Sequence, residues 1–188
     1  MRKILVFLLI FFSTKAYSEG IGFEGGFAYG DIGAEETAQR IANLSGSTTT
    51  VTYDEATWYG RLFYEHDLSS DSFLDLGYFM TGSLDATYTL SGASATEGYS
   101  FSGLEASYGV KSDGVYFKGG VHQSLIEGTA SITIGGTTYA AEASADGMGY
   151  LFGGGIETDG TRYGVTYYGN LGGVEDTSLL VLFYGVKF

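Results

Sequence analysis

The feature that most constrains this chain is an alternation of apolar and polar side chains that recurs in eight separate segments. Successive side chains of a β-strand point to opposite faces, so this period predicts strands with one apolar and one polar face. The alternating segments lie at about residues 21–30, 58–68, 74–84, 103–110, 115–125, 148–157, 162–171 and 180–188. After Gly20 no segment keeps a helical period over three turns. We therefore expect an all-β domain.

The N-terminal segment has a different character from the rest of the chain. A positively charged Met-Arg-Lys start precedes nine consecutive apolar residues, and the small residues Ala16 and Ser18 follow. This pattern is typical of a secretory signal peptide cleaved after Ser18 or Ala16. Nine residues are too few to cross roughly 30 Å of hydrocarbon as a helix. We predict a signal peptide at residues 1–18 and one exported domain at residues 19–188.

Composition excludes several classes of function. The 188 residues contain no Cys, two His, nine Lys and Arg, and 22 Asp and Glu, for a net charge of −13. The absence of Cys rules out disulfides and thiolate metal sites, and two separated histidines make a poor zinc site. The negative charge disfavours contact with phosphates. No phosphate-binding loop is present either, so we expect no nucleic-acid partner, no metal and no cofactor.

The connections between the alternating segments alternate in length. Short turns rich in Ser, Asp and Gly are expected at residues 69–71, 112–114 and 158–160, and longer links at 33–56, 89–98, 128–143 and 172–176. This alternation places all short turns on one side of a barrel and all long links on the other. The sequence thus predicts an eight-stranded antiparallel transmembrane β-barrel with short periplasmic turns and longer surface loops.

The distribution of charge decides which face of the strands points outward. The apolar face carries almost no charge, whereas the opposite face carries most of the charged residues of the strands. Charges cost more among lipid tails than in a closed interior where they can pair. We therefore predict a polar lumen containing a charge network of Glu24, Arg61, Glu65, Asp75, Glu105, Lys118, His122, Glu157, Arg162 and Lys187, with Asp67 on the same face.

Aromatic residues on the apolar face lie toward strand ends, where Tyr and Trp favour the membrane–water interface. We predict an interfacial girdle of Tyr29, Trp58, Tyr64, Tyr78 and Tyr163, with Tyr88 and Tyr184 on the same face.

The chain ends in Phe-Tyr-Gly-Val-Lys-Phe, with hydrophobic side chains at Tyr184, Val186 and Phe188. This end resembles the C-terminal signal of outer-membrane barrels, and the whole mature pattern resembles the small eight-stranded outer-membrane β-barrel family that includes outer-membrane proteins A and X. The resemblance implies a Gram-negative outer membrane, recognition by the barrel-assembly machinery, contact with lipid and lipopolysaccharide, and a monomer. It implies little about activity, because these barrels host unrelated functions.

One short motif in the sequence is a candidate for enzymatic chemistry. His122-Gln123-Ser124 resembles the His-x-Ser of the lipid A deacylases, in which the His activates the Ser. Alternation points both side chains into the lumen, and Leu125 stands where that family continues with Asn. We therefore expect a structural histidine and a non-enzymatic protein.

Function is then expected in the long links. The link at residues 33–56 is the longest, with acids, a Ser/Thr run and a stretch at residues 34–43 that could form helical turns. We predict a structural or surface-adhesion and recognition role through these acidic loops, with a host or envelope ligand. The alternatives are a narrow ion channel gated by the lumen charges and, less favoured, a lipid A-modifying enzyme.

Overall fold

The structure is a computed structural model that describes residues 20–31, 33–46, 48–90 and 93–188. The predicted signal peptide lies outside the described residues. The elements are, in order, β1 (Gly20–Tyr29), α2 (Ala34–Ser45), β2 (Thr50–Tyr53), β3 (Ala56–Ser69), β4 (Ser72–Thr81), β5 (Leu84–Leu90), β6 (Ala93–Ser112), β7 (Val115–Ile134), β8 (Thr137–Thr158), β9 (Thr161–Gly169), the 3-10 helix η1 (Leu171–Gly173) and β10 (Ser178–Lys187).

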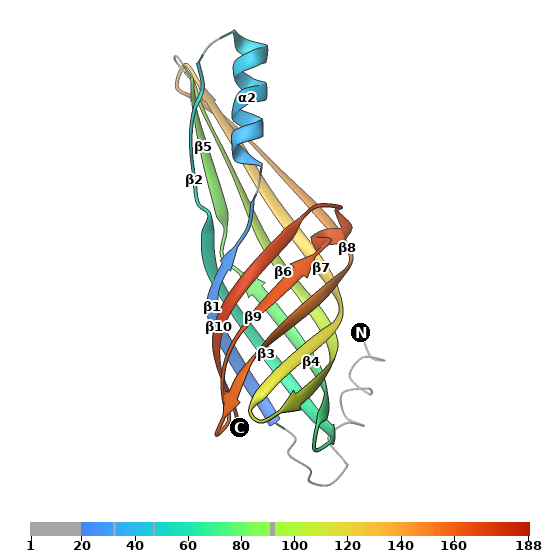
Figure 1. Cartoon of the computed structure of the whole chain (residues 1–188). Coiled ribbons are helices and arrows are strands. Elements are labelled where there is room, and N and C mark those ends of the chain that lie inside the picture. Colours follow the sequence, from blue (N-terminus) through green and yellow to red (C-terminus); the bar gives the residue numbers. More distant parts are fainter. Residues whose placement is uncertain (1–19, 32, 47, 91–92) are drawn as a thin grey trace.

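Eight of these strands form a closed antiparallel barrel with tilted strands (Figure 1). The order around the barrel is β1, β3, β4, β6, β7, β8, β9 and β10, and the ring closes because β10 pairs with β1, with Phe27 opposite Leu182. Closure leaves no strand edge within the barrel, which a membrane requires because lipid offers no hydrogen-bond partner to the backbone. The predicted eight-stranded antiparallel barrel is confirmed.

Tight turns gather at one end of the barrel, where the C-terminus also lies (Figure 1). Two of them are Asp-Gly pairs with positive φ at both residues, 51° and 80° at Asp113 and Gly114 and 51° and 76° at Asp159 and Gly160. Such turns match the right-handed twist of paired strands, which is why they favour Asp and Gly. The predicted short turns are therefore confirmed, and we call this the periplasmic end.

The outer wall of the barrel is apolar. Its exposed side chains include Ile21, Phe23, Phe27, Leu62, Leu76, Met80, Leu104, Phe117, Val121, Met148, Phe152, Ile156, Leu180 and Leu182. A soluble protein does not present an apolar surface of this extent to water. The wall is suited to lipid contact, as alternation in the sequence predicts.

At the opposite end, three barrel strands continue far beyond the ring and form part of an extracellular sheet (Figure 1). This sheet has the order β2, β5, β6, β7 and β8. We call this sheet and helix α2 the head; it comprises β2, β5, α2 and residues 93–99, 128–134 and 137–149. The described residues of the predicted longer links at 89–98 and 128–143 thus lie mostly in paired strands, a structure that the sequence analysis does not predict there.

Helix α2 packs on one face of the head sheet. Its residues Ala34, Ala38 and Ile41 recur at the spacing of one helix face and contact β5 at Ala86 and Tyr88. Gly33 and Gly46, both with positive φ, bound the helix. The helical turns expected at residues 34–43 are confirmed and extend to Ser45. Neither described helix has the length and apolar character needed to span a membrane.

Three side chains that alternation assigns to the outer face are instead buried: Leu84, Tyr88 and Leu171. Leu171 is buried because β9 ends at Gly169 and Leu171 begins η1. Leu84 was expected to continue the outward set of the third segment, and Tyr88 was expected in the girdle. β4 ends at Thr81, and the chain then enters β5, which pairs with β2 rather than with the barrel strand β3. Leu84 therefore packs in the barrel mouth, and Tyr88 lies beneath α2. Where the chain changes its sheet partner, the alternation of one strand no longer indicates which side chains of the next strand are buried.

The packing of α2 can be tested with trypsin, because Arg40 is the only basic residue in the head. Substituting the buried Ala38 with Asp places an unpaired polar group against the sheet, which we expect to detach the helix and accelerate cleavage at Arg40 by about tenfold or more. Band intensities on denaturing gels measure the rate. The exposed neighbour Gln39→Asp is the control; equal cleavage of both variants would contradict the packing.

Candidate functional site

The lumen next to the periplasmic end holds a cluster of ion pairs. We call it the lower cluster; its members are Glu65, Asp67, Lys111, Glu157, Arg162 and Lys187. Arg162 pairs with Glu65 and lies 2.5 Å (Nη2 to Oε2) from Glu157, and Lys187 Nζ is 2.9 Å from a carboxylate oxygen of each. Lys111 joins Glu65 at 3.1 Å to Asp67 at 2.7 Å. Three cations therefore balance three carboxylates.

A second cluster lies further into the barrel. This middle cluster comprises Glu24, Arg61, Asp75, Glu105 and Lys118. Arg61 binds three carboxylates: Glu24 at 3.0 Å, Glu105 at 2.6 Å and Asp75. Lys118 Nζ lies 3.5 Å from Asp75 and 3.6 Å from Glu105. Arg61 is thus the centre of the cluster, and its guanidinium is fully buried.

The register of the strands places these charged groups at one level of the lumen. Glu24 on β1 lies opposite Arg61 on β3, and Gly77 on β4 lies opposite Glu105 on β6. A Cβ at Gly77 would collide with the guanidinium of Arg61. The missing side chain therefore gives Arg61 the space to extend across the lumen, which is the close approach that a glycine in a strand permits.

Aromatic side chains close the lumen above the middle cluster. Tyr168 donates a hydrogen bond of 2.7 Å to Glu105, and its hydroxyl is 3.0 Å from that of Tyr59. Phe79 packs on Tyr168 with ring centroids 4.6 Å apart, and His122 packs against both rings. We call Tyr59, Phe79, His122 and Tyr168 the aromatic layer. It leaves the charged clusters separated from the extracellular mouth.

The histidine and serine of the tested motif engage other partners. His122 Nε2 lies 3.1 Å from the carbonyl oxygen of Gly169, and Ser124 Oγ accepts a hydrogen bond of 2.8 Å from the N–H of Gly172. Both side chains are buried in the lumen. A base must be within hydrogen-bond reach of the nucleophile that it activates. The arrangement here instead anchors η1 over the mouth of the barrel.

The head is strongly acidic. Its single cation is Arg40, whereas its carboxylates, together with those at the adjoining rim of the barrel, are Asp31, Glu35, Glu36, Asp54, Glu55, Asp85, Glu97, Glu127, Glu142, Asp146, Glu175 and Asp176. Two of them bind tyrosines. Tyr53 donates to Glu35 at 3.2 Å, which raises the pKa of the tyrosine. The pKa of Tyr88 is also raised. The larger cause is burial beneath α2, and the second is the hydrogen bond that its hydroxyl donates to Glu97.

The ten lumen residues singled out by the sequence all lie inside the barrel. Nine belong to the two clusters, and His122 belongs to the aromatic layer rather than to an ion pair. Lys111 was not recognised, although the same alternation extended beyond residue 110 would have placed it inward. Tyr59 and Tyr168 were not singled out either, although the same alternation places them on the inner face with Arg61 and Arg162.

Of the predicted girdle, Tyr29, Trp58, Tyr78 and Tyr163 are exposed on the outer wall, and Tyr64 is half-buried there. Tyr163 packs on Tyr184 with ring centroids 5.2 Å apart. Their interfacial role remains a prediction.

We predict that removing Arg61, the centre of the middle cluster, greatly lowers the stability of the barrel. Arg61→Met leaves Glu24, Asp75 and Glu105 with Lys118 as their remaining cation. We expect the free energy of unfolding to fall by about 3–5 kcal/mol, the usual cost of leaving buried charges without their partner. Urea unfolding in lipid vesicles measures it, with the exposed Arg40→Met as control. An equal stability of the two variants would show that the cluster does not hold the barrel together.

Comparison with known proteins identifies the fold of this chain. No protein-family model matches the sequence, and no curated protein matches it. Among solved structures, Ail, the attachment invasion locus protein of Yersinia pestis, is 12% identical with a TM-score of 0.55, over 92% of this chain and 100% of that one. OprG from Pseudomonas aeruginosa is 12% identical with a TM-score of 0.50, over 91% and 96%. The chain therefore has the fold of the small bacterial outer-membrane β-barrels, as its sequence predicts.

Proposed function

We propose that this chain is a non-enzymatic outer-membrane protein whose head recognises a partner at the cell surface. The observation that carries the proposal is the free edge of β8 in the head. Residues 137–149 pair with β7 on one side, whereas β9 begins to pair with β8 only at Tyr150. Over residues 137–144 this edge has no second ladder partner among the described strands, and further along β8 the 3-10 helix η1 lies against Gly147. The unpaired backbone groups of such an edge form a template for another strand.

The side chains along this edge leave it open. Residues 137–145 are mostly Thr, Ala and Ser, and side chains on both faces of residues 137–144 are exposed. Soluble proteins usually protect an edge with Lys, Pro or a bulge; here neither Lys nor Pro is present. An extended segment of a partner can add to such an edge through main-chain hydrogen bonds. The partner class that this supports is a protein presenting an extended strand.

The lumen supports recognition rather than open conduction. Both ion-pair clusters and the aromatic layer fill the interior, and an eight-stranded barrel is only wide enough for its own side chains. Permeation would require the pairs at Arg61 and Arg162 to break first. The gated channel remains the second candidate from the sequence, and a conductance measurement separates it from recognition.

The charge of this head does not suit the kind of ligand that a similar structure binds. Ail has been crystallised with the heparin analogue sucrose octasulfate, a polyanion. The present head has Arg40 as its single cation. Like charges repel, so its field favours basic partners and disfavours sulfated polysaccharides.

The last strand carries the proposed assembly signal. β10 closes the barrel between β1 and β9, and Tyr184 and Phe188 are exposed. We propose that Tyr184, Val186 and Phe188 are read by the barrel-assembly machinery, and that the folded monomer contacts lipid and lipopolysaccharide through its outer wall.

Shortening the β7–β8 hairpin tests the proposed function. Ala130 lies opposite Ala141, so deleting residues 131–134 and 137–140 joins the strands through Gly135-Gly136 in the same register. We expect bacteria that display this variant to adhere several-fold less to epithelial monolayers than bacteria that display the full chain. Gln39→Ala with Asn43→Ala, on the exposed face of α2, is the control. Equal adhesion of the shortened variant and the full chain would refute the role of the edge.

Planar-bilayer recording tests the second candidate. Because ion pairs and aromatic rings fill the lumen, we expect the folded protein to give no steady single-channel conductance. A steady conductance that changes on Lys118→Gln or Arg162→Gln would favour the gated channel.

A further inference from the structure

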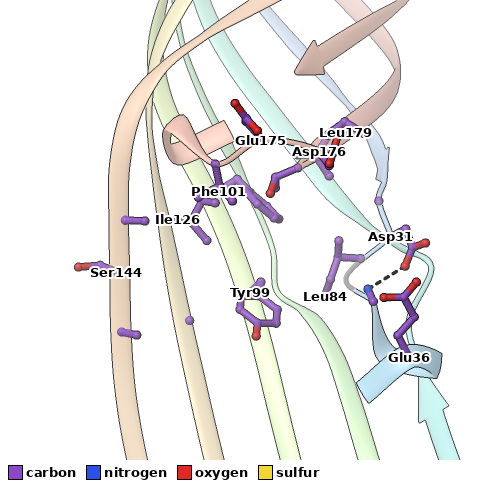
Figure 2. A pocket seen from close by; sticks show the side chains of 18 residues that line it. Asp31, Glu36, Leu84, Tyr99, Phe101, Ile126, Ser144, Glu175, Asp176 and Leu179 are labelled. Carbon is purple, nitrogen blue, oxygen red and sulfur yellow. Dashed lines mark hydrogen bonds between the residues drawn. The ribbon is translucent and has the colours of Figure 1, made fainter. Parts of the chain in front are cut away.

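A cavity of about 570 Å³ opens at the mouth of the barrel beneath the head (Figure 2). Its walls come from segments far apart in the sequence: the residues after β1 and the start of α2, the strands β5 to β8, and residues 174–179, which lead into β10. A volume in this range is typical of small-molecule sites.

The floor of the cavity is apolar. Leu84, Phe101 and Leu179 are almost fully buried in the protein, and Ile126 packs against them from β7. The ring of Tyr99 adds a half-buried aromatic face, held by the bond of its hydroxyl to Glu97 at 3.3 Å. This floor can bury the apolar body of a ligand, which is favourable because it removes apolar surface from water.

The rim of the cavity is acidic on two walls. Asp31 and Glu36 come from the segment that joins β1 to α2, and Glu175 and Asp176 come from the segment after η1 (Figure 2). No basic residue is among the described residues that line the cavity. Asp31 accepts a hydrogen bond of 2.8 Å from the N–H of Gly33, so it also fixes the start of the helix.

A metal ion does not account for this rim. Within the described residues, no three carboxylate or histidine side chains come close enough to hold one. The rim carboxylates stand apart above an apolar floor, and a bare divalent cation would leave that floor in contact with water. The ligand must therefore combine positive charge with apolar surface.

We propose that this cavity binds a small organic cation with an apolar body, such as an aryl-alkyl ammonium. The apolar part contacts Leu84, Phe101 and Ile126, and the ammonium lies at the rim near Glu36 and Asp176. The rings of Tyr99 and Phe101 favour a cation by the attraction of their faces for positive charge. The acidic head raises the local concentration of cations, and the same field excludes anions. This inference goes beyond the proposed function because it concerns a small-molecule site, to which β8 contributes Ala143, Ser144 and Ala145 but not the outer part of its edge.

The experiment is calorimetric titration of the folded mature protein in nanodiscs of zwitterionic lipid. Four probes separate the contributions: phenethylammonium carries charge and ring, phenethyl alcohol the ring, tetramethylammonium the charge, and calcium a metal ion. We expect saturable binding of one phenethylammonium, at least tenfold tighter than any of the other three. Equal affinity for the alcohol, for tetramethylammonium or for calcium would overturn the proposal.

Variants locate the binding. Glu36→Gln with Asp176→Asn removes two rim charges, and Asp54→Asn with Glu142→Gln removes the same charge from the head outside the cavity. We expect the first pair to weaken phenethylammonium at least tenfold and the second pair to change its affinity less than threefold. All four side chains are exposed, so neither pair disturbs the core. Equal weakening by both pairs would show a diffuse field and no site.

The two proposals fail separately. The shortened β7–β8 hairpin keeps Gly128 and Ala143 in the cavity wall, so we expect it to retain phenethylammonium binding even where adhesion is lost. Loss of both in that variant would show that the cavity depends on the outer hairpin and would overturn the separation argued here.

Discussion

The burial of Arg61 among three carboxylates is the interaction on which the rest of the barrel depends. A membrane forces the apolar face of every strand outward, so the polar face must be satisfied inside a lumen only as wide as its own side chains. Unpaired charges would be costly there, and paired ones are tolerated when their geometry is good. Arg61 spans from β1 to β4 and β6, with the space that Gly77 leaves. The register of three strand pairs is therefore tied to one guanidinium.

The same constraint explains the charge of the head. Mature strands use five cations, Arg61, Lys111, Lys118, Arg162 and Lys187, to neutralise carboxylates in the lumen. Among the described residues Arg40 is the one other Lys or Arg, so nearly all the remaining carboxylates face the exterior unbalanced. The negative charge of the chain is therefore unevenly distributed between the lumen and the exterior. The paired charges of the lumen nearly balance, whereas the carboxylates of the head and of the adjoining rim form an exterior that attracts cations.

Alternation made the barrel predictable, because each inward or outward assignment follows from a period of two and each charge reinforces it. The final strand has apolar residues on both faces, and its inward side chains Leu179, Val181 and Phe183 fill the lumen around the aromatic layer and the mouth. Residues 128–143 escaped recognition as strand because Ala, Ser, Thr and Gly give no contrast between faces when both are in water. Leu84 and Tyr88 were misplaced where the chain changes sheets, a tertiary event that local pattern does not encode.

The cavity combines features that none of these local patterns contains. Its floor takes Leu84 from β5, Phe101 from β6, Ile126 from β7 and Leu179 from β10, and its rim takes carboxylates from two connecting segments. The aromatic layer lies beneath it, between the cavity and the charged clusters. A ligand that enters the cavity from outside would therefore meet the aromatic layer before it reached the charged clusters. Binding at the mouth and passage through the wall are separate properties in this barrel, and a molecule selected by the rim need not be one that the lumen can conduct.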